Sequence, residues 1–127
     1  MLGQDYFSQW MNISLIEVKE NYCLIEMPIK KEMINGLKTV HGGVTFAFAD
    51  SALAFSSNNS GDAAVALNCV INFTKAGKEG DLFRAESILV NETRKTAIYD
   101  IKITNQNEEL IAKFVGTVYK IGKKITE

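Results

Sequence analysis

The stretch GGVTFAFADSALAFSSN, residues 42–58, decides the fold of this chain. It is rich in alanine and long enough for at least four helical turns, so it predicts an α-helix. Its residues are apolar or small on nearly every side, which is typical of a helix buried in the fold. One carboxylate, that of Asp50, falls midway along this helix.

The segments on either side of this helix have the pattern of strands. Residues 96–104, TAIYDIKIT, alternate between apolar and polar side chains, which predicts a half-buried antiparallel strand. Further strands are expected at 13–19, 22–29, 63–74, 81–93 and 109–121, with a loop at 30–41 and a short amphipathic helix at 3–11, inside an N-terminal segment 1–12. This order favours an α+β fold, in which an antiparallel sheet of five or six strands holds one long helix. Strands that are apolar on both faces suggest that a second subunit covers part of the sheet.

Length and composition exclude several classes of protein. With 127 residues the chain is expected to form a single domain, 1–127. Its 14 Lys and Arg against 15 Asp and Glu argue against nucleic acid as a partner, which would require a basic excess. Two cysteines and one histidine predict neither a disulfide framework nor a metal site. No signal-like or membrane-spanning segment is found, so we expect a cytoplasmic protein with no membrane partner.

Asp50 is the first candidate for chemistry. No Lys or Arg lies within one helical turn of it, and a carboxylate in apolar surroundings has a raised pKa. A raised pKa suits a general base near neutral pH. An Asp bonded to a backbone or hydroxyl group in a structural network fits the sequence equally well. Both interpretations require the side chain to be buried, so an Asp50 that faces bulk solvent would contradict them.

His41, Gly42 and Gly43 lie where the long helix begins. A helix start presents free N–H groups and a partial positive charge, which suit the oxyanion of a carbonyl under attack. A tight turn that needs flexible residues explains two glycines just as simply. The chain has no G-x-S-x-G, G-x-G-x-x-G or Walker motif. Cys23 and Cys69 lie in apolar strand patterns without nearby basic groups and are expected to be inert.

Taken together, these motifs resemble the hotdog-fold acyl-CoA thioesterases of the phenylacetic-acid-degradation type. The similarity is carried by NGLKTVHGGVTFAFADSALAFSSN (35–58), FTKAGKEGD (73–81) and TAIYDIKITNQ (96–106), and it extends over about residues 10–122. Most specific is the set of Asn-Gly, His-Gly-Gly and an Asp nine residues after the His. The resemblance implies a curved sheet wrapped around one helix, homodimers with active sites at the interface, and dimers paired into a homotetramer.

The same resemblance implies roles for particular residues. Asp50 would be the general base or the nucleophile, and would reach the site from the opposite subunit. Gly42 N–H would polarise the thioester carbonyl, while His41 and Asn35 would position substrate or water. The positions implied to bind substrate are Gly43, Asn58, Asn68, Arg94, Lys95 and Thr96, the last three at the nucleotide end of coenzyme A. Coenzyme A is then part of the substrate, and no cofactor is implied.

A thioester suits such a small catalytic set, because the thiolate leaves with a pKa of about 8.5 and needs little general-acid help. The implied substrates are aromatic or medium-chain acyl-CoA esters. Two alternatives stay open at this point. One is a hotdog hydratase or dehydratase acting on acyl thioesters, and the other is a non-catalytic acyl-CoA-binding protein.

Overall fold

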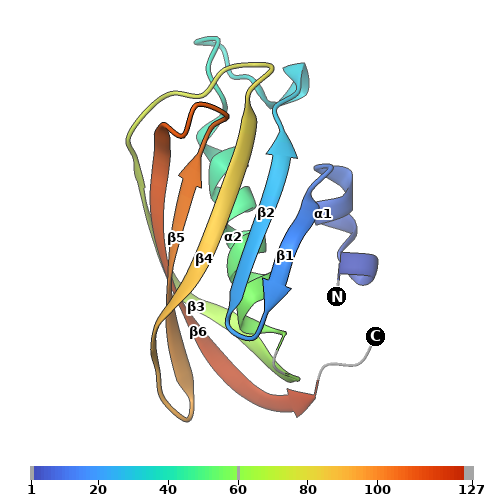
Figure 1. Cartoon of the computed structure of the whole chain (residues 1–127), viewed down its shortest axis with the longest axis vertical. Coiled ribbons are helices and arrows are strands. Elements are labelled where there is room, and N and C mark those ends of the chain that lie inside the picture. Colours follow the sequence, from blue (N-terminus) through green and yellow to red (C-terminus); the bar gives the residue numbers. More distant parts are fainter. Residues whose placement is uncertain (1, 60, 125–127) are drawn as a thin grey trace.

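One long helix lies across a curved antiparallel sheet in the computed structural model, which describes residues 2–59 and 61–124 (Figure 1). Short helical turns at Leu2–Gln4 and Lys31–Met33 accompany the two α-helices. The elements are α1 (Tyr6–Trp10), β1 (Ser14–Lys19), β2 (Tyr22–Pro28), α2 (Gly42–Ser57), β3 (Asp62–Phe73), β4 (Leu82–Glu92), β5 (Thr96–Thr104) and β6 (Leu110–Lys124). The expected α+β class, with one long helix and a sheet of five or six strands, is confirmed.

The six strands follow the order β1-β2-β4-β5-β6-β3, and every neighbouring pair is antiparallel. The chain therefore crosses from β2 through α2 to the far edge, where β3 pairs with β6. This crossover lays α2 over the concave face of the sheet, as Figure 1 shows. Neither α-helix in the described part of the chain is long and apolar enough to cross a bilayer.

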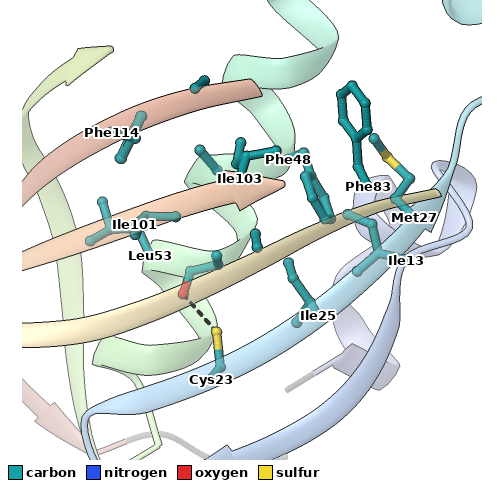
Figure 2. Packing of buried hydrophobic residues seen from close by; sticks show 14 of the residues in the cluster. Ile13, Cys23, Ile25, Met27, Phe48, Leu53, Phe83, Ile101, Ile103 and Phe114 are labelled. Carbon is teal, nitrogen blue, oxygen red and sulfur yellow. Dashed lines mark hydrogen bonds between the residues drawn. The ribbon is translucent and has the colours of Figure 1, made fainter. Parts of the chain in front are cut away.

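The core fills the space between α2 and the concave face of the sheet. Burial alternates along β2, where Cys23, Ile25 and Met27 point inward, and along β5, where Ile101 and Ile103 do so. Figure 2 shows these side chains facing Phe48 and Leu53 of α2. The alternation of apolar and polar residues therefore places the apolar side chains on the face of the sheet that contacts α2, and the polar side chains on the opposite face.

Strand β3 departs from this pattern. It forms an edge of the sheet, and most of its residues are exposed. The exposed fractions of its large apolar side chains are 49% for Val65, 64% for Leu67, 54% for Val70 and 56% for Phe73. A long apolar edge strand has unpaired backbone N–H and C=O groups and exposed apolar side chains, which another chain can cover. The expectation of a second subunit fits this edge and stays a prediction.

Candidate active site

The segment before α2 is anchored at several points, so the helix begins at a defined place. Val40 N–H donates to the carbonyl of Gly77 (2.9 Å), and His41 N–H donates to the carbonyl of Met33 (2.9 Å). Ile34 and Val40 also form an antiparallel bridge, which closes the loop between them. The start of α2 is therefore held to both the β3–β4 connection and the segment after β2.

His41 caps the helix with its own side chain. Its Nδ1 accepts from Gly43 N–H at 2.8 Å, and its carbonyl accepts from Val44 N–H at 2.9 Å. An Nδ1 that accepts carries no proton, so in this arrangement the ring proton is on Nε2. The ring is exposed, and Nε2–H is free to donate to a bound molecule.

Gly42 N–H has no hydrogen-bond partner among residues 2–59 and 61–124. It lies in the first turn of a 16-residue helix, where the backbone dipoles favour negative charge. A Cβ at Gly42 would lie 3.3 Å from Phe73 Cζ, so the exposed end of β3 rests directly beside this glycine. One backbone donor is thus left open at the helix start, as predicted.

Asn35 lies in the loop closed by the Ile34–Val40 bridge. Its Oδ1 accepts from Leu37 N–H (2.9 Å) and Thr39 N–H (3.2 Å), which fixes the side chain. Its Nδ2 donates to no residue in the described ranges, so these two N–H bonds remain available. Within the described ranges, Asn35 therefore keeps two free N–H donors and His41 keeps one at the end of the loop that precedes α2.

The expectation that Asp50 is buried within the chain is wrong, because the residue is exposed. The reason is the way α2 packs. One side of the helix faces the sheet, while a stripe of four exposed or half-buried residues, Gly43, Ala47, Asp50 and Ala54, points away from it. We call these four residues the open stripe. Helix composition alone does not distinguish a side covered by the chain's own sheet from a side left open.

The surroundings of Asp50 still raise the pKa of its carboxyl above the usual value. Partial burial is the larger cause, and the negative charge of Asp5 adds to it. Asp5 is placed there by α1: its carboxylate accepts from Ser8 N–H (2.9 Å) and from Ser8 Oγ (2.7 Å). Ser8 Oγ in turn lies 2.8 Å from Ser51 Oγ on α2, next to Asp50 in the sequence.

Gly42 and Asp50 of one chain cannot act on the same carbonyl. Eight residues along a helix correspond to about 12 Å, whereas a reacting carbonyl needs both groups within about 3 Å. Gly42 is half-buried beside Phe73, whereas Asp50 is exposed on the open stripe. A site that uses both groups therefore needs Asp50 from a second chain.

Asn58 and Asn68 lie farther along the chain. Asn58 ends α2: its Nδ2 donates to the carbonyls of Ala54 (3.0 Å) and Ala64 (3.2 Å), and its Oδ1 accepts from Ala64 N–H (2.8 Å). These bonds account for Asn58 without a substrate. Asn68 is exposed on edge strand β3, beside an irregularity in its pairing with β6. The predicted binding roles of both residues stay predictions.

Arg94, Lys95 and Thr96 form the turn between β4 and β5. Thr96 is used inside the turn, where its Oγ1 lies 2.8 Å from Thr93 Oγ1. Arg94 and Lys95 are exposed, and in the described ranges their side chains have no ion-pair partner. In Figure 1 this turn lies at the opposite end of the molecule from the start of α2. One chain therefore does not bring the two basic residues to Gly42.

The cysteines differ from each other. Cys23 is buried, donates from Sγ to the carbonyl of Ala52, and has a pKa raised to about 12 mainly by burial, so it is inert as expected. Cys69 is only half-buried, and burial followed by the charge of Asp50 raises its pKa. Among the residues described, no group of three His, Cys, Asp or Glu side chains is arranged to hold a metal ion.

Three residues near this site escaped the sequence analysis. Asp5 and Ser8 are separated from Ser51 by more than forty positions in the sequence. Phe73 follows Gly42 by 31 positions, although the two residues are in contact in the fold. No local spacing links such pairs. The one available signal was the Asp5-x-x-Ser8 pattern, which is typical of a helix N-cap.

Comparisons with known proteins agree with this fold. The family model described as Thioesterase superfamily matches residues 37–112. The acyl-coenzyme A thioesterase PaaI of Escherichia coli K12 is 35% identical over 126 residues, covering 99% of this chain and 90% of that protein. The solved structure of E. coli PaaI, from the phenylacetic acid degradation operon, has a TM-score of 0.97 over 99% of this chain and 91% of its own. A Streptococcus mutans UA159 protein bound to acetyl CoA has a TM-score of 0.86 at 27% identity, covering 90% and 92% of the two chains.

Proposed function

The chain belongs to the thioesterase superfamily and is a thioester hydrolase acting on acyl-CoA, and on that premise we propose which residues perform the reaction. Asp50 is the general base or nucleophile, Gly42 N–H is the oxyanion donor, and His41 and Asn35 position substrate or water. The observation that supports this assignment most directly is on α2. Gly42 N–H is left open at the start of this helix, and the carboxylate of Asp50, which has a raised pKa, lies on the open stripe.

The active site in this proposal is shared between two subunits. A two-fold axis through the open stripes would place two α2 helices antiparallel, with Gly42 of one chain opposite Asp50 of the partner subunit. The same contact would cover the exposed apolar edge of β3, including Phe73 beside Gly42. It would also withdraw Asp50 from solvent and raise its pKa further. Pairing of such dimers into a tetramer is part of the proposal but is not needed for the chemistry.

The reaction requires a base that takes up one proton and later returns it, and one good leaving group. In the general-base form, Asp50 takes a proton from water, and the water oxygen bonds to the thioester carbon. Gly42 N–H and the start of α2 stabilise the oxyanion. The C–S bond then breaks, and the coenzyme A thiolate takes the proton back from Asp50. In the nucleophilic form, an Asp50 oxygen attacks the thioester carbon, the C–S bond breaks and the coenzyme A thiolate leaves. Water then hydrolyses the mixed anhydride, which restores the Asp50 carboxylate, releases the carboxylic acid and supplies the proton that the thiolate takes up.

Coenzyme A would lie toward the basic turn of a neighbouring subunit. Its phosphates call for cationic groups, and Arg94 and Lys95 are exposed without an acidic partner in the described part of the chain. Gly43, Asn58, Asn68 and Thr96 are the further proposed contacts. The E. coli relative comes from a phenylacetic acid degradation operon, which supports aromatic acyl groups and a role in phenylacetate breakdown. Medium-chain acyl groups are the alternative substrates.

A panel of CoA esters tests the proposed activity. Phenylacetyl-, benzoyl-, hexanoyl- and butyryl-CoA are incubated with the protein, and free thiol is measured with a chromogenic thiol reagent. We expect thiol release with at least one ester. Addition of water to an enoyl-CoA without thiol release would instead indicate the hydratase alternative. Tight binding of all esters without either reaction would indicate a non-catalytic binding protein.

The pH profile of the enzyme is expected to depend on Asp5. Asp50 acts as the carboxylate, so kcat/KM falls as the pH drops through its raised pKa. Replacing Asp5 with asparagine removes the like charge, lowers the pKa of Asp50 and moves this acid limb to lower pH. Asparagine still caps α1, so Ser8 stays in place. An acid limb at the same pH in both proteins would contradict the assignment.

Mixing two inactive variants tests whether the site is shared. A dimer of one Asp50→Asn chain and one Gly42→Pro chain holds one site with both native groups and one site with neither. About a quarter of all sites are therefore restored in a randomly assembled mixture, and half of the sites in the purified mixed dimer. The two chains are co-expressed with different tags, and the mixed dimer is purified through both. Mixed dimers no more active than the parent variants would exclude a shared site.

A further inference from the structure

A cavity of about 570 Å³ lies between α1 and the first turns of α2. Its walls include Phe7 and Trp10 of α1, Met33 before α2, and Val44 and Ala47 of α2. His41 and Gly43 line it at the helix start, and Lys30 and Glu32 add two charged side chains. The two residues that flank Gly42, the proposed oxyanion donor, therefore line one end of the cavity, which follows α2 as far as Ala47.

Helix α1 forms a fixed wall of this cavity although it has only five residues. Ser8 is completely buried and bonds to Ser51 on α2 and to Asp5 at its own N-terminus. Met11 and Ile13, 3% and 5% exposed, anchor the following residues in the core. The helix is thus held to α2 by a buried polar contact and to the core by apolar contacts.

The aromatic side chains of this anchored helix are left open. Trp10 is 76% exposed and Phe7 49%, and their rings lie 5.9 Å apart at 46°. Two buried methionines, Met11 and Met33, lie beside them in the cavity wall. Tilted aromatic pairs and methionine sulfur both make favourable contacts with a further aromatic ring. The wall therefore has the composition of a site for a flat, apolar ring.

We propose that Phe7 and Trp10 form the acyl-binding wall and make the enzyme selective for aromatic acyl groups. This inference rests on the proposed function, because the occupant is the acyl part of the thioester whose carbonyl meets Gly42 N–H. His41 and Gly43, which line the cavity, directly precede and follow Gly42 in the chain. Most of its wall is apolar and its two charged residues, Lys30 and Glu32, have opposite signs, so the cavity matches an aryl group better than the phosphates of coenzyme A.

Trp10→Ala tests the selectivity, and Tyr6→Ala is the matched control. Tyr6 is on the same helix and is also 76% exposed, but it does not line the cavity. We compare kcat/KM for phenylacetyl-CoA and butyryl-CoA. Trp10→Ala is expected to lower the ratio of the two values by about tenfold or more, the usual effect of losing an apolar pocket contact. Tyr6→Ala is expected to leave the ratio unchanged. An equal loss on both esters, or an unchanged ratio in Trp10→Ala, overturns the inference.

Fluorescence of Trp10 gives a second test that needs neither turnover nor a substitution in α1. Trp10 is the single tryptophan of the chain, so its emission reports directly on this wall. In the Asp50→Asn protein, phenylacetyl-CoA is expected to change the emission, while coenzyme A alone leaves it unchanged. Binding without any change in emission overturns the inference even if the enzyme is active. Absence of thiol release by the wild-type protein refutes the proposed function instead, so the two failures are distinguishable.

Discussion

Asp50→Asn is expected to lower kcat for thioester hydrolysis by roughly 10²–10⁴-fold, the usual contribution of a general base. The amide has nearly the same shape as the carboxylate, but it can neither take a proton from water nor attack the carbonyl. The fold should be unaffected, because Asp50 is exposed and its carboxylate accepts no hydrogen bond within residues 2–59 and 61–124. Thiol release with the best ester of the panel gives kcat, and thermal unfolding gives stability.

Glu79→Gln is the control for the change in charge. Glu79 is exposed in the connection between β3 and β4, and its removal alters the net charge by the same amount. We expect wild-type kcat from this variant. Asp50→Glu adds a comparison of position, because the carboxylate is kept but moved by one methylene, and an intermediate loss is expected. Hydrolysis at the wild-type rate by Asp50→Asn would exclude both proposed roles of this residue.

The elements of the fold could be predicted because their signals are local. Residues 42–58 predict the helix observed at Gly42–Ser57, and the alternation in 96–104 predicts β5 and its buried face. The place of β3 beside β6 could not be predicted in the same way, because it depends on contacts between segments some fifty residues apart. Local patterns such as helix composition and strand alternation therefore predict single elements, but they do not predict which strands pair.

The candidate site was predicted in part. His41 and Gly42 were found from their position before a helix, and the structure shows an exposed cap and an open N–H there. Asp50 was found as a lone charge in an apolar helix, but its burial was wrongly assigned to its own chain. An apolar helix with one charged residue has the same sequence pattern whether its surface is covered by the sheet of its own chain or by a partner subunit. The contribution of α1 was missed, because the contact of Ser8 with Ser51 is set by packing and leaves no periodic signal.

The last prediction isolates a single hydrogen-bond donor. Gly42→Pro removes the backbone N–H proposed to stabilise the oxyanion, and loss of such a donor lowers kcat by about 10²–10³-fold. Proline is well suited to the first position of a helix, where the N–H has no intrahelical partner. The preceding residue also has the required backbone conformation, since His41 has φ −59° and ψ 132°. The helix should therefore form normally in the variant.

Gly42→Ala separates loss of the donor from crowding. Alanine keeps the N–H but places a Cβ at the same point, 3.3 Å from Phe73 Cζ. Phe73 is 56% exposed, so in the isolated chain its ring has space to move. If the N–H stabilises the transition state, Gly42→Ala retains most of the activity and Gly42→Pro loses it, with little change in KM, because the donor acts on the oxyanion more than on the bound ester. Equal losses in the two variants would mean that space beside Phe73, rather than the N–H, is what the reaction requires of Gly42.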